Sequence, residues 1–220
     1  MTRASSRLET AFSAVLVVVA ITMLSLHLHD RAQADAARRA AAIVEDWETL
    51  TATGIRWGGS DAAPLVITEF MDFTCPYCSQ MASVIDSLVS AYPQQFRVVF
   101  HYFPLRGHDL AVPAATAAEC AREQGRFREM YRSLFAHQDS LRSWDWTAFG
   151  KDAGVPDLGA YSHCVSRPDT EFPQIAAGRR AGEEAGVGGT PTIWLNGEFV
   201  TARSVADFKE LARSHKVKLP

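Results

Sequence analysis

The sequence predicts an α/β domain into which a block of helices is inserted. Residues 64–70 and 96–103 are apolar segments with β-type side chains, which is typical of buried strands. The next strand signal comes only at residue 192, and apolar residues recur at helical spacing in between. Since strands flank a long helical stretch, we expect one mixed α/β core interrupted by a helical insertion at about residues 106–186.

The N-terminal segment, residues 1–30, is distinct from this domain. Residues 10–29 carry no formal charge, and Arg3 and Arg7 precede them. An apolar run behind basic residues is typical of a signal peptide or a membrane anchor, and the basic residues hold that end inside the cell. The small-x-small run at residues 32–34 offers a cleavage site, but it lies beyond the apolar core. We therefore favour an uncleaved anchor helix, with the rest of the chain in an oxidising, extracytoplasmic compartment.

Residues 31–63 are expected to connect the anchor to the domain, as a helical stalk at 31–50 and a loop at 51–63. The stalk is rich in Ala, Arg and Glu. The domain proper then covers residues 64–220. With 47% apolar residues and a net charge of −3, the chain suits one globular domain and shows no sign of nucleic-acid binding. We expect no cofactor and no resident metal.

Helices are expected directly after the first strand and throughout the insertion. After residues 64–70, apolar side chains recur at helical spacing up to Ala91, at Met81, Val84, Ile85, Leu88 and Val89. In the insertion we expect helices at 111–123, 126–137, 146–153, 158–166 and 172–185.

The C-terminal part is expected to return to strands and then end in a helix. Asn196-Gly197, which follows the strand beginning near residue 192, is a type I′ hairpin signal. The final helix is expected at residues 204–214, with Ser204 as its N-cap and Asp207 three residues on.

A pair of cysteines, Cys75 and Cys78, stands between the first strand and its helix. Strand, Cys-x-x-Cys and helix in succession predict a redox-active dithiol. The first sulfur faces the unpaired amides of the helix N-terminus, which stabilise a thiolate. We therefore expect Cys75 to be the nucleophile and Cys78 to be the buried resolving thiol. A structural disulfide or half of a metal site is the alternative interpretation of the pair.

Four segments together resemble one family, the DsbA-like thiol:disulfide oxidoreductases of the thioredoxin superfamily, in the branch with Cys-Pro-Tyr-Cys. They are residues 69–78, 101–105, 118–121 and 186–192, and the resemblance extends over roughly residues 60–212. It implies a thioredoxin fold with an inserted helical domain and a redox-active Cys75–Cys78 disulfide. It also implies that Thr190-Pro191 forms a cis-proline loop beside the two sulfurs.

The activity that this resemblance implies is dithiol oxidation of unfolded or reduced exported proteins on the periplasmic side of the membrane. The protein would act as a monomer, and a membrane redox partner would reset its dithiol. A disulfide isomerase or reductase would use the same chemistry. A Cys-x-x-Cys copper chaperone is an alternative of a different class, with His101 or His108 as a further ligand.

Several residues near the pair are expected to tune it. Glu69 lies in the buried strand and matches the acid that this family keeps behind the second cysteine, so we expect it to accept the proton of Cys78. Pro76 and Tyr77 stand between the cysteines, and Tyr77 cannot carry positive charge, so we expect a less oxidising pair than one with His there. Thr190 offers a hydroxyl to the site. Asp72 is expected to be exposed, without an assigned role.

The remaining cysteines, Cys120 and Cys164, both fall in the helical insertion. Two leftover cysteines in an exported protein usually pair, so a structural disulfide is expected. Two buried free thiols are the alternative.

Overall fold

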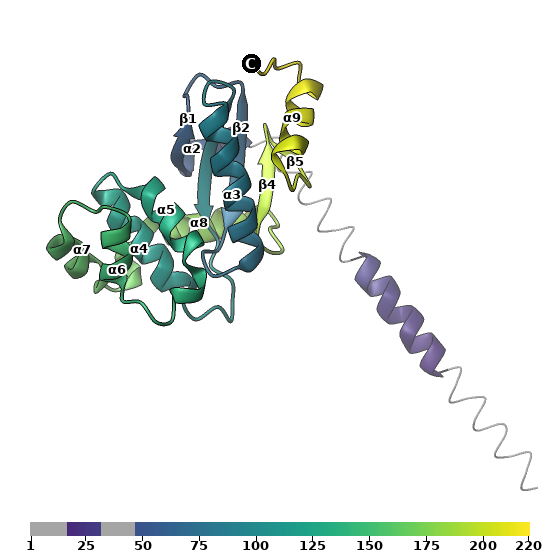
Figure 1. Cartoon of the computed structure of the whole chain (residues 1–220). Helices are drawn as coiled ribbons and strands as arrows, with labels where there is room; N and C mark the ends of the chain where they lie inside the picture. The colour runs from purple at the N-terminus through teal and green to yellow at the C-terminus, as the bar shows by residue number, and fades with distance from the viewer. Residues whose placement is uncertain (1–16, 32–46) are drawn as a thin grey trace, which may run out of the picture. The chain divides into compact units, whose positions relative to one another are not determined.

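The computed structural model describes residues 17–31 and 47–220 (Figure 1). The chain divides into two units, Met1–Arg39 and Ala40–Pro220. In the first, residues 17–31 form a helix with exposed side chains. Within the described residues, no helix combines the length and the apolar character that crossing a membrane requires.

Parts of the N-terminal predictions fall on residues that the structure does not describe. Arg3, Arg7 and the small-x-small run at 32–34 lie outside the described residues, as does most of the expected stalk. These features stay predictions.

A five-stranded mixed sheet forms the centre of the second unit, in the order β1-β3-β2-β4-β5. β2 and β3 are parallel, and the other neighbouring pairs are antiparallel. Every residue of β2 is buried, which explains its uninterrupted apolar pattern. The strands are β1 (Ile55–Gly59), β2 (Leu65–Met71), β3 (Phe96–Tyr102), β4 (Thr192–Leu195) and β5 (Glu198–Phe199).

The prediction of a loop at residues 51–63 is wrong at residues 51–53, which belong to α2 (Trp47–Thr53), and in its central part. Residues 55–59 form β1, an edge strand that pairs with β3. Its register shifts between Arg56 and Gly58, so Trp57 is the extra residue of a β-bulge. The strand is short and ends in two glycines, which is why no strand pattern is visible in the sequence. Gly59 has φ +82°, and a Cβ there would collide with the Phe96 carbonyl, so glycine is required.

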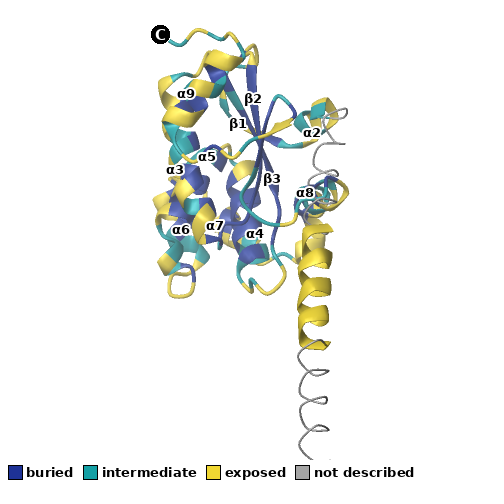
Figure 2. Cartoon of the chain, turned by 90° about the vertical axis from the view of Figure 1, so that its right-hand side faces the viewer, coloured by how far each residue is buried: buried dark blue, intermediate teal, exposed yellow. Residues whose placement is uncertain are grey.

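Helices cover both faces of the sheet (Figure 2). α2 (Trp47–Thr53) and α8 (Pro173–Glu184) lie on one face, and α3 (Pro76–Ala91) and α9 (Val205–Ser214) lie on the other. Gly178 lets α8 approach β3 closely, since a Cβ there would lie 2.6 Å from the Tyr102 carbonyl oxygen. The side chains of β2 alternate accordingly. Phe70 belongs to the apolar cluster on the α8 side, with Ala181 and Ala185, and Glu69 lies on the other side, where it contacts Tyr131.

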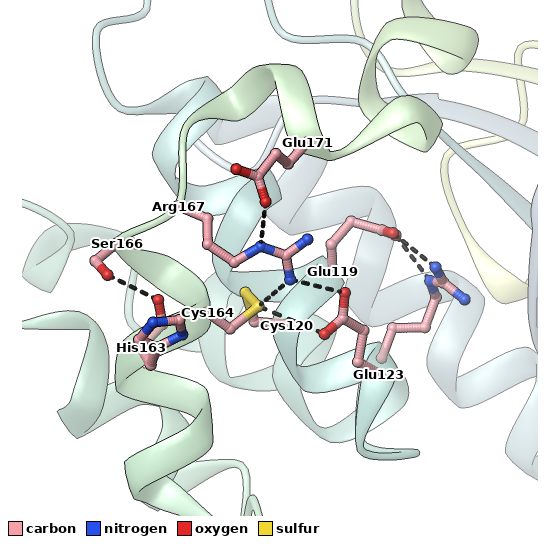
Figure 3. A network of polar contacts seen from close by, with 9 residues as sticks. Glu119, Cys120, Glu123, His163, Cys164, Ser166, Arg167 and Glu171 are labelled. Atoms are coloured by element: carbon pink, nitrogen blue, oxygen red, sulfur yellow. Dashed lines mark hydrogen bonds and ion pairs between the residues drawn. A yellow bond between two sulfur atoms is a disulfide. The ribbon is translucent and has the colours of Figure 1, made fainter.

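The chain between β3 and β4 is helical, as the sequence predicts. Asp145 and Asp157 cap the N-termini of α6 and α7 through their side chains. Cys120 and Cys164 form a disulfide that links α4 to α7, with the sulfurs 1.98 Å apart (Figure 3). The helices before α8 are α4 (Ala111–Glu123), α5 (Phe127–Ala136), α6 (Trp146–Asp152) and α7 (Leu158–Val165), with short 3₁₀ turns at Gln138–Ser140 and Asp169–Glu171.

The C-terminal elements follow the sequence signals closely. Asn196 and Gly197 both have positive φ, as a type I′ turn requires, and they join β4 to β5. Ser204 and Asp207 form a reciprocal capping box at the start of α9.

Candidate active site

Cys75 occupies the N-cap of α3, where β2 has just ended. Its backbone is extended, and Pro76 follows as the first helical residue, where its fixed φ suits a helix start. Cys78 lies one turn further along α3 and is fully buried, whereas Cys75 keeps 5% of its surface exposed. Both thiols are unbonded, so the structure represents the reduced dithiol.

The pKa of Cys75 is lowered from its ordinary value of 9.0 to about 5. The main cause is a hydrogen bond from the Cys78 side chain, and smaller contributions come from Thr190 and from the backbone amides of Cys78 and Tyr77. Burial opposes them. The Thr190 hydroxyl itself is buried and has no hydrogen-bond partner among the described residues. The sequence predicts the contribution of the helix N-terminus, and the structure adds that the neighbouring thiol contributes more.

The pKa of Cys78 moves in the opposite direction, far above that of an ordinary thiol. Burial is the largest cause, and the hydrogen bond with Cys75 acts in the same direction, since Cys78 is the donor of that bond. Near neutral pH the two thiols therefore share one proton, which resides on Cys78.

The Thr190-Pro191 peptide bond is cis and lies beside the pair. The Cys75 Sγ lies 3.4 Å from the Thr190 carbonyl oxygen. The cis-proline loop, which is remote from Cys75 in sequence, therefore lies against the reactive sulfur. β4, the strand that follows this loop, pairs with β2 and so holds the loop in place.

Glu69 is fully buried on the face of β2 that packs against α3. The Trp57 indole Nε1 donates to Glu69 Oε1 at 2.8 Å, and the Tyr131 hydroxyl donates to Oε2 at 3.4 Å. Burial raises the pKa of Glu69 to about 8, while the bonds from Trp57 and Tyr131 oppose that rise. A carboxyl group with such a pKa exists in both forms near neutral pH.

Asp72 is buried rather than exposed, and this corrects the sequence prediction. Its carboxylate accepts hydrogen bonds from the Thr74 amide and hydroxyl at 2.7 and 2.6 Å, and from the Leu105 amide at 2.9 Å. The fourth partner is His108 Nδ1 at 2.8 Å. Asp72 thus ties the loop before Cys75 to the chain that follows β3. Its partners at 105 and 108 are remote in sequence, so the sequence does not reveal its burial.

Gln138, the first residue of the 3₁₀ turn that follows α5, also holds this loop. Its Nε2 donates to the carbonyl oxygens of Phe73 at 2.7 Å and Cys75 at 3.0 Å. The helical insertion therefore fixes the backbone on either side of Thr74 directly. No sequence signal marks Gln138, because its role depends on where the insertion folds back.

An open cavity of about 410 Å³ lies next to the pair, lined by Tyr77, Met81, Pro191, Ile193 and Phe199 among others. Tyr77 and Phe199 are 70% and 54% exposed, which is unusual for large apolar side chains. In the described part of the second unit, the other exposed large hydrophobic side chain is that of Trp144, at 38%. An apolar surface of this kind beside a reactive group is typical of a site for peptide side chains.

The two histidines considered as metal ligands have other partners. His101 is buried, contacts the Leu50 carbonyl oxygen at 2.9 Å and stacks on Phe70, and burial lowers its pKa to about 4. His108 contacts Asp72 and Thr74. Among the described residues, no cluster of three or more His, Cys, Asp or Glu side chains could hold a metal ion.

Trp57 and Tyr131 are further site residues that the sequence does not reveal. Trp57 falls in the expected loop, and only its alternation with Ile55 hints at a strand. Tyr131 has helical spacing in the insertion and looks like any core residue of α5.

Comparison with known proteins agrees with this geometry. The sequence model described as Thioredoxin matches residues 51–212. Among solved structures, the thiol-disulfide exchange protein alpha-DsbA2 from Wolbachia pipientis superposes with a TM-score of 0.64 at 18% identity, covering 81% of this chain and 98% of that chain. Oxidised BdbD from Bacillus subtilis gives a TM-score of 0.62 at 18% identity, covering 74% and 92%. At these identities the likeness concerns the fold.

Curated relatives match over a smaller share of their own length. Na(+)/H(+) antiporter NhaA 3 of Salinispora tropica is 38% identical over 141 residues, which is 63% of this chain and 21% of the relative. Na(+)/H(+) antiporter NhaA 1 of Mycolicibacterium gilvum is 33% identical over 142 residues, which is 64% of this chain and 23% of the relative. The chain spans less than a quarter of the length of these relatives.

Proposed function

Because the chain belongs to the thioredoxin family, we propose that it is a thiol:disulfide oxidoreductase that exchanges disulfides through Cys75 and Cys78. The observation that carries this proposal is the position of Cys75 at the N-cap of α3 with Cys78 buried one turn further on, which shifts the Cys75 pKa downward and the Cys78 pKa upward. A stabilised thiolate is a good nucleophile and a good leaving group. A structural disulfide needs no such asymmetry.

In the oxidising direction, a substrate thiolate attacks Sγ of Cys75, and the Cys75–Cys78 bond breaks. Cys78 leaves as a thiolate and takes a proton. A second substrate thiolate then attacks the substrate sulfur of the mixed disulfide, and Cys75 leaves as a stable thiolate. Two electrons pass from the substrate dithiol to the protein. The products are a substrate disulfide, the Cys75 thiolate and the Cys78 thiol.

Glu69 is proposed to exchange the proton of Cys78. As a neutral acid it protonates the leaving thiolate of Cys78, and as a carboxylate it accepts that proton when the pair is oxidised again. Its complete burial and its raised pKa support this role. Pro76, Tyr77, Thr190 and Pro191 are proposed to border the pair and contact the substrate.

We propose reduced or unfolded polypeptides as substrates, bound with apolar side chains against Tyr77 and Phe199. Oxidation is the favoured direction, because a stabilised Cys75 thiolate stabilises the reduced protein and makes the disulfide oxidising. Isomerase or reductase activity uses the same chemistry and would follow if a partner kept the pair reduced. The metallochaperone alternative has little support, since His101 and His108 have other partners.

The proposed location is outside the cytoplasm, on the periplasmic side of the membrane. The arginine-flanked apolar run and the Cys120–Cys164 disulfide both support it. The run would act as an anchor or as a cleaved export signal. A membrane redox partner would reoxidise the pair after each turnover.

The test is oxidative refolding of a reduced model protein by the oxidised chain, with Cys75→Ser as the matched control. We expect acceleration by the wild type and none by the variant. Equal rates would refute the oxidoreductase proposal. Stoichiometric copper bound through Cys75 and Cys78 would favour the metallochaperone instead. The redox state of Cys75 and Cys78, trapped in cells, would decide the direction of electron flow, and a mostly reduced pair would favour a reductase or isomerase.

A further inference from the structure

Two glutamates, Glu69 and Glu119, are buried among the described residues, and their partners differ in kind. Glu119 receives the guanidinium of Arg122 at 2.9 and 2.8 Å, together with the Tyr102 hydroxyl at 2.9 Å. Glu69 receives only the neutral donors Trp57 and Tyr131. A guanidinium fixes a carboxylate in its charged form, whereas neutral donors leave it free to gain a proton.

Trp57 reaches Glu69 from β1, which is not adjacent to β2 in the sheet. β3 lies between the two strands, so the long indole side chain extends past β3 to the Glu69 carboxyl group. Trp57 is the extra residue of the β-bulge between Arg56 and Gly58. Bulges re-aim side chains and are common beside active sites. The indole donates to one oxygen of this buried acid.

The two donors also hold each other in place. The rings of Trp57 and Tyr131 have centroids 4.5 Å apart. The guanidinium of Arg128 lies 5.7 Å from the Trp57 ring centroid, and Asp86 holds it with an ion pair of 2.9 Å. Contacts from three elements therefore fix the geometry around Glu69.

We propose that Trp57 and Tyr131 are positioning residues that hold the Glu69 carboxyl group between two neutral donors, so that it can both give a proton to Cys78 and accept one from it. This inference rests on the proposed function, because it assumes that Glu69 exchanges the Cys78 proton.

The energetics around Glu69 agree with this role. Burial disfavours the carboxylate and so favours the protonated form of Glu69, which cannot accept a proton. The two hydrogen bonds stabilise the carboxylate and moderate that effect, which leaves the pKa at about 8. The pKa of Tyr131 is raised well above its ordinary value, chiefly by burial, so its hydroxyl stays a donor.

Other ionisable groups nearby do not replace the two donors. Asp86 is paired with Arg128 and Arg132, and these three charges partly compensate each other. The titratable and charged groups of the elements packed around Glu69 are Cys75, Tyr77, Cys78 and Asp86 at α3, Arg128, Glu129, Tyr131 and Arg132 on α5, Arg97, His101 and Tyr102 on β3, and Arg56 on β1.

The test compares Tyr131→Phe and Trp57→Phe in the reduced full-length protein. The readouts are the titration of the Glu69 carboxyl carbon by NMR and the pH profile of disulfide exchange. Both variants should move the Glu69 midpoint upward, and each rise of one pH unit lowers the ionised fraction at pH 7 about tenfold. The rate at which Cys78 attacks a mixed disulfide at pH 7 should fall by the same factor.

The matched controls remove similar groups elsewhere. Tyr161→Phe deletes the hydroxyl of another buried tyrosine, one with no hydrogen-bond partner among the described residues. Trp194→Phe removes a buried indole from the opposite face of the sheet. Neither should move the Glu69 midpoint. If Trp57→Phe does not fold, Tyr131→Phe, which removes a single oxygen, still decides the matter.

The outcomes separate this inference from the proposed function. If Glu69→Gln abolishes the pH dependence but neither Tyr131→Phe nor Trp57→Phe shifts it, the positioning role is refuted and the function of Glu69 stands. If Glu69→Gln changes nothing while activity still requires Cys75, the inference falls and the oxidoreductase proposal survives. If activity does not require Cys75, the oxidoreductase proposal fails.

Discussion

Replacing Cys120 and Cys164 by alanine removes the covalent link between α4 and α7. The link closes a loop with a sequence separation of 44 residues. In the chain-entropy model, a loop of that length restricts the unfolded chain by about 4 kcal/mol. We therefore expect the double variant to lose about that much free energy of unfolding, which lowers the melting temperature by roughly 8–16 °C for a domain of this size.

The assay is urea unfolding in a background where Cys75 and Cys78 are both alanine, so that no reactive thiol reshuffles the disulfide. In that background, dithiothreitol should destabilise the parent by the same amount as the Cys120→Ala, Cys164→Ala substitution, and should leave the double variant unchanged. Disulfide exchange by the double variant that keeps Cys75 and Cys78 should persist below its melting temperature. A loss of less than about 1 kcal/mol would refute the reasoning that the link restricts the unfolded chain.

Three further predictions concern single side chains. Asp72→Asn cannot accept all the bonds that the carboxylate accepts, so urea unfolding should show a loss of about 1–3 kcal/mol; an unchanged midpoint would contradict the tethering role. Phe199→Ser should raise KM for an apolar peptide roughly 5- to 30-fold through lost burial of about 1–2 kcal/mol, with no effect on a small thiol substrate; equal effects on both would exclude the cavity as the peptide site. Ser204→Ala should cost about 1 kcal/mol of stability by removing the N-cap of α9, and no loss would show that the capping box contributes little.

The sequence predicts most elements of the domain because their signals are local. The buried strand at 65–71, the helix after Cys75, the turn at Asn196-Gly197 and the cap at Ser204 each depend on neighbouring residues. β1 is not predicted because the strand is short, has a β-bulge at Trp57 and ends in two glycines. Its strand identity comes from pairing with β3, which the sequence around it does not encode.

The site is predictable only in the part that shares one stretch of chain. Cys75, Cys78 and Glu69 stand within ten positions of one another, so motif and burial identify them. Trp57, Tyr131 and Gln138 come to the site from β1, α5 and the turn after α5, through tertiary packing. Their role at the site depends on how the helical insertion packs against the sheet, and no local pattern in the sequence indicates that packing.

The most direct measurement of the central claim is the ultraviolet absorbance of the thiolate in the reduced protein as a function of pH. The lowered pKa predicts a Cys75 midpoint near 5, with Cys78 remaining protonated beyond the range of an ordinary thiol. A lowered pKa stabilises the folded reduced protein fully above the ordinary thiol pKa, and that stabilisation is lost as the pH falls through about 5. Cys75→Ser should abolish the transition near pH 5. A Cys75 midpoint at or above the free-thiol value of about 8.5 would contradict the account.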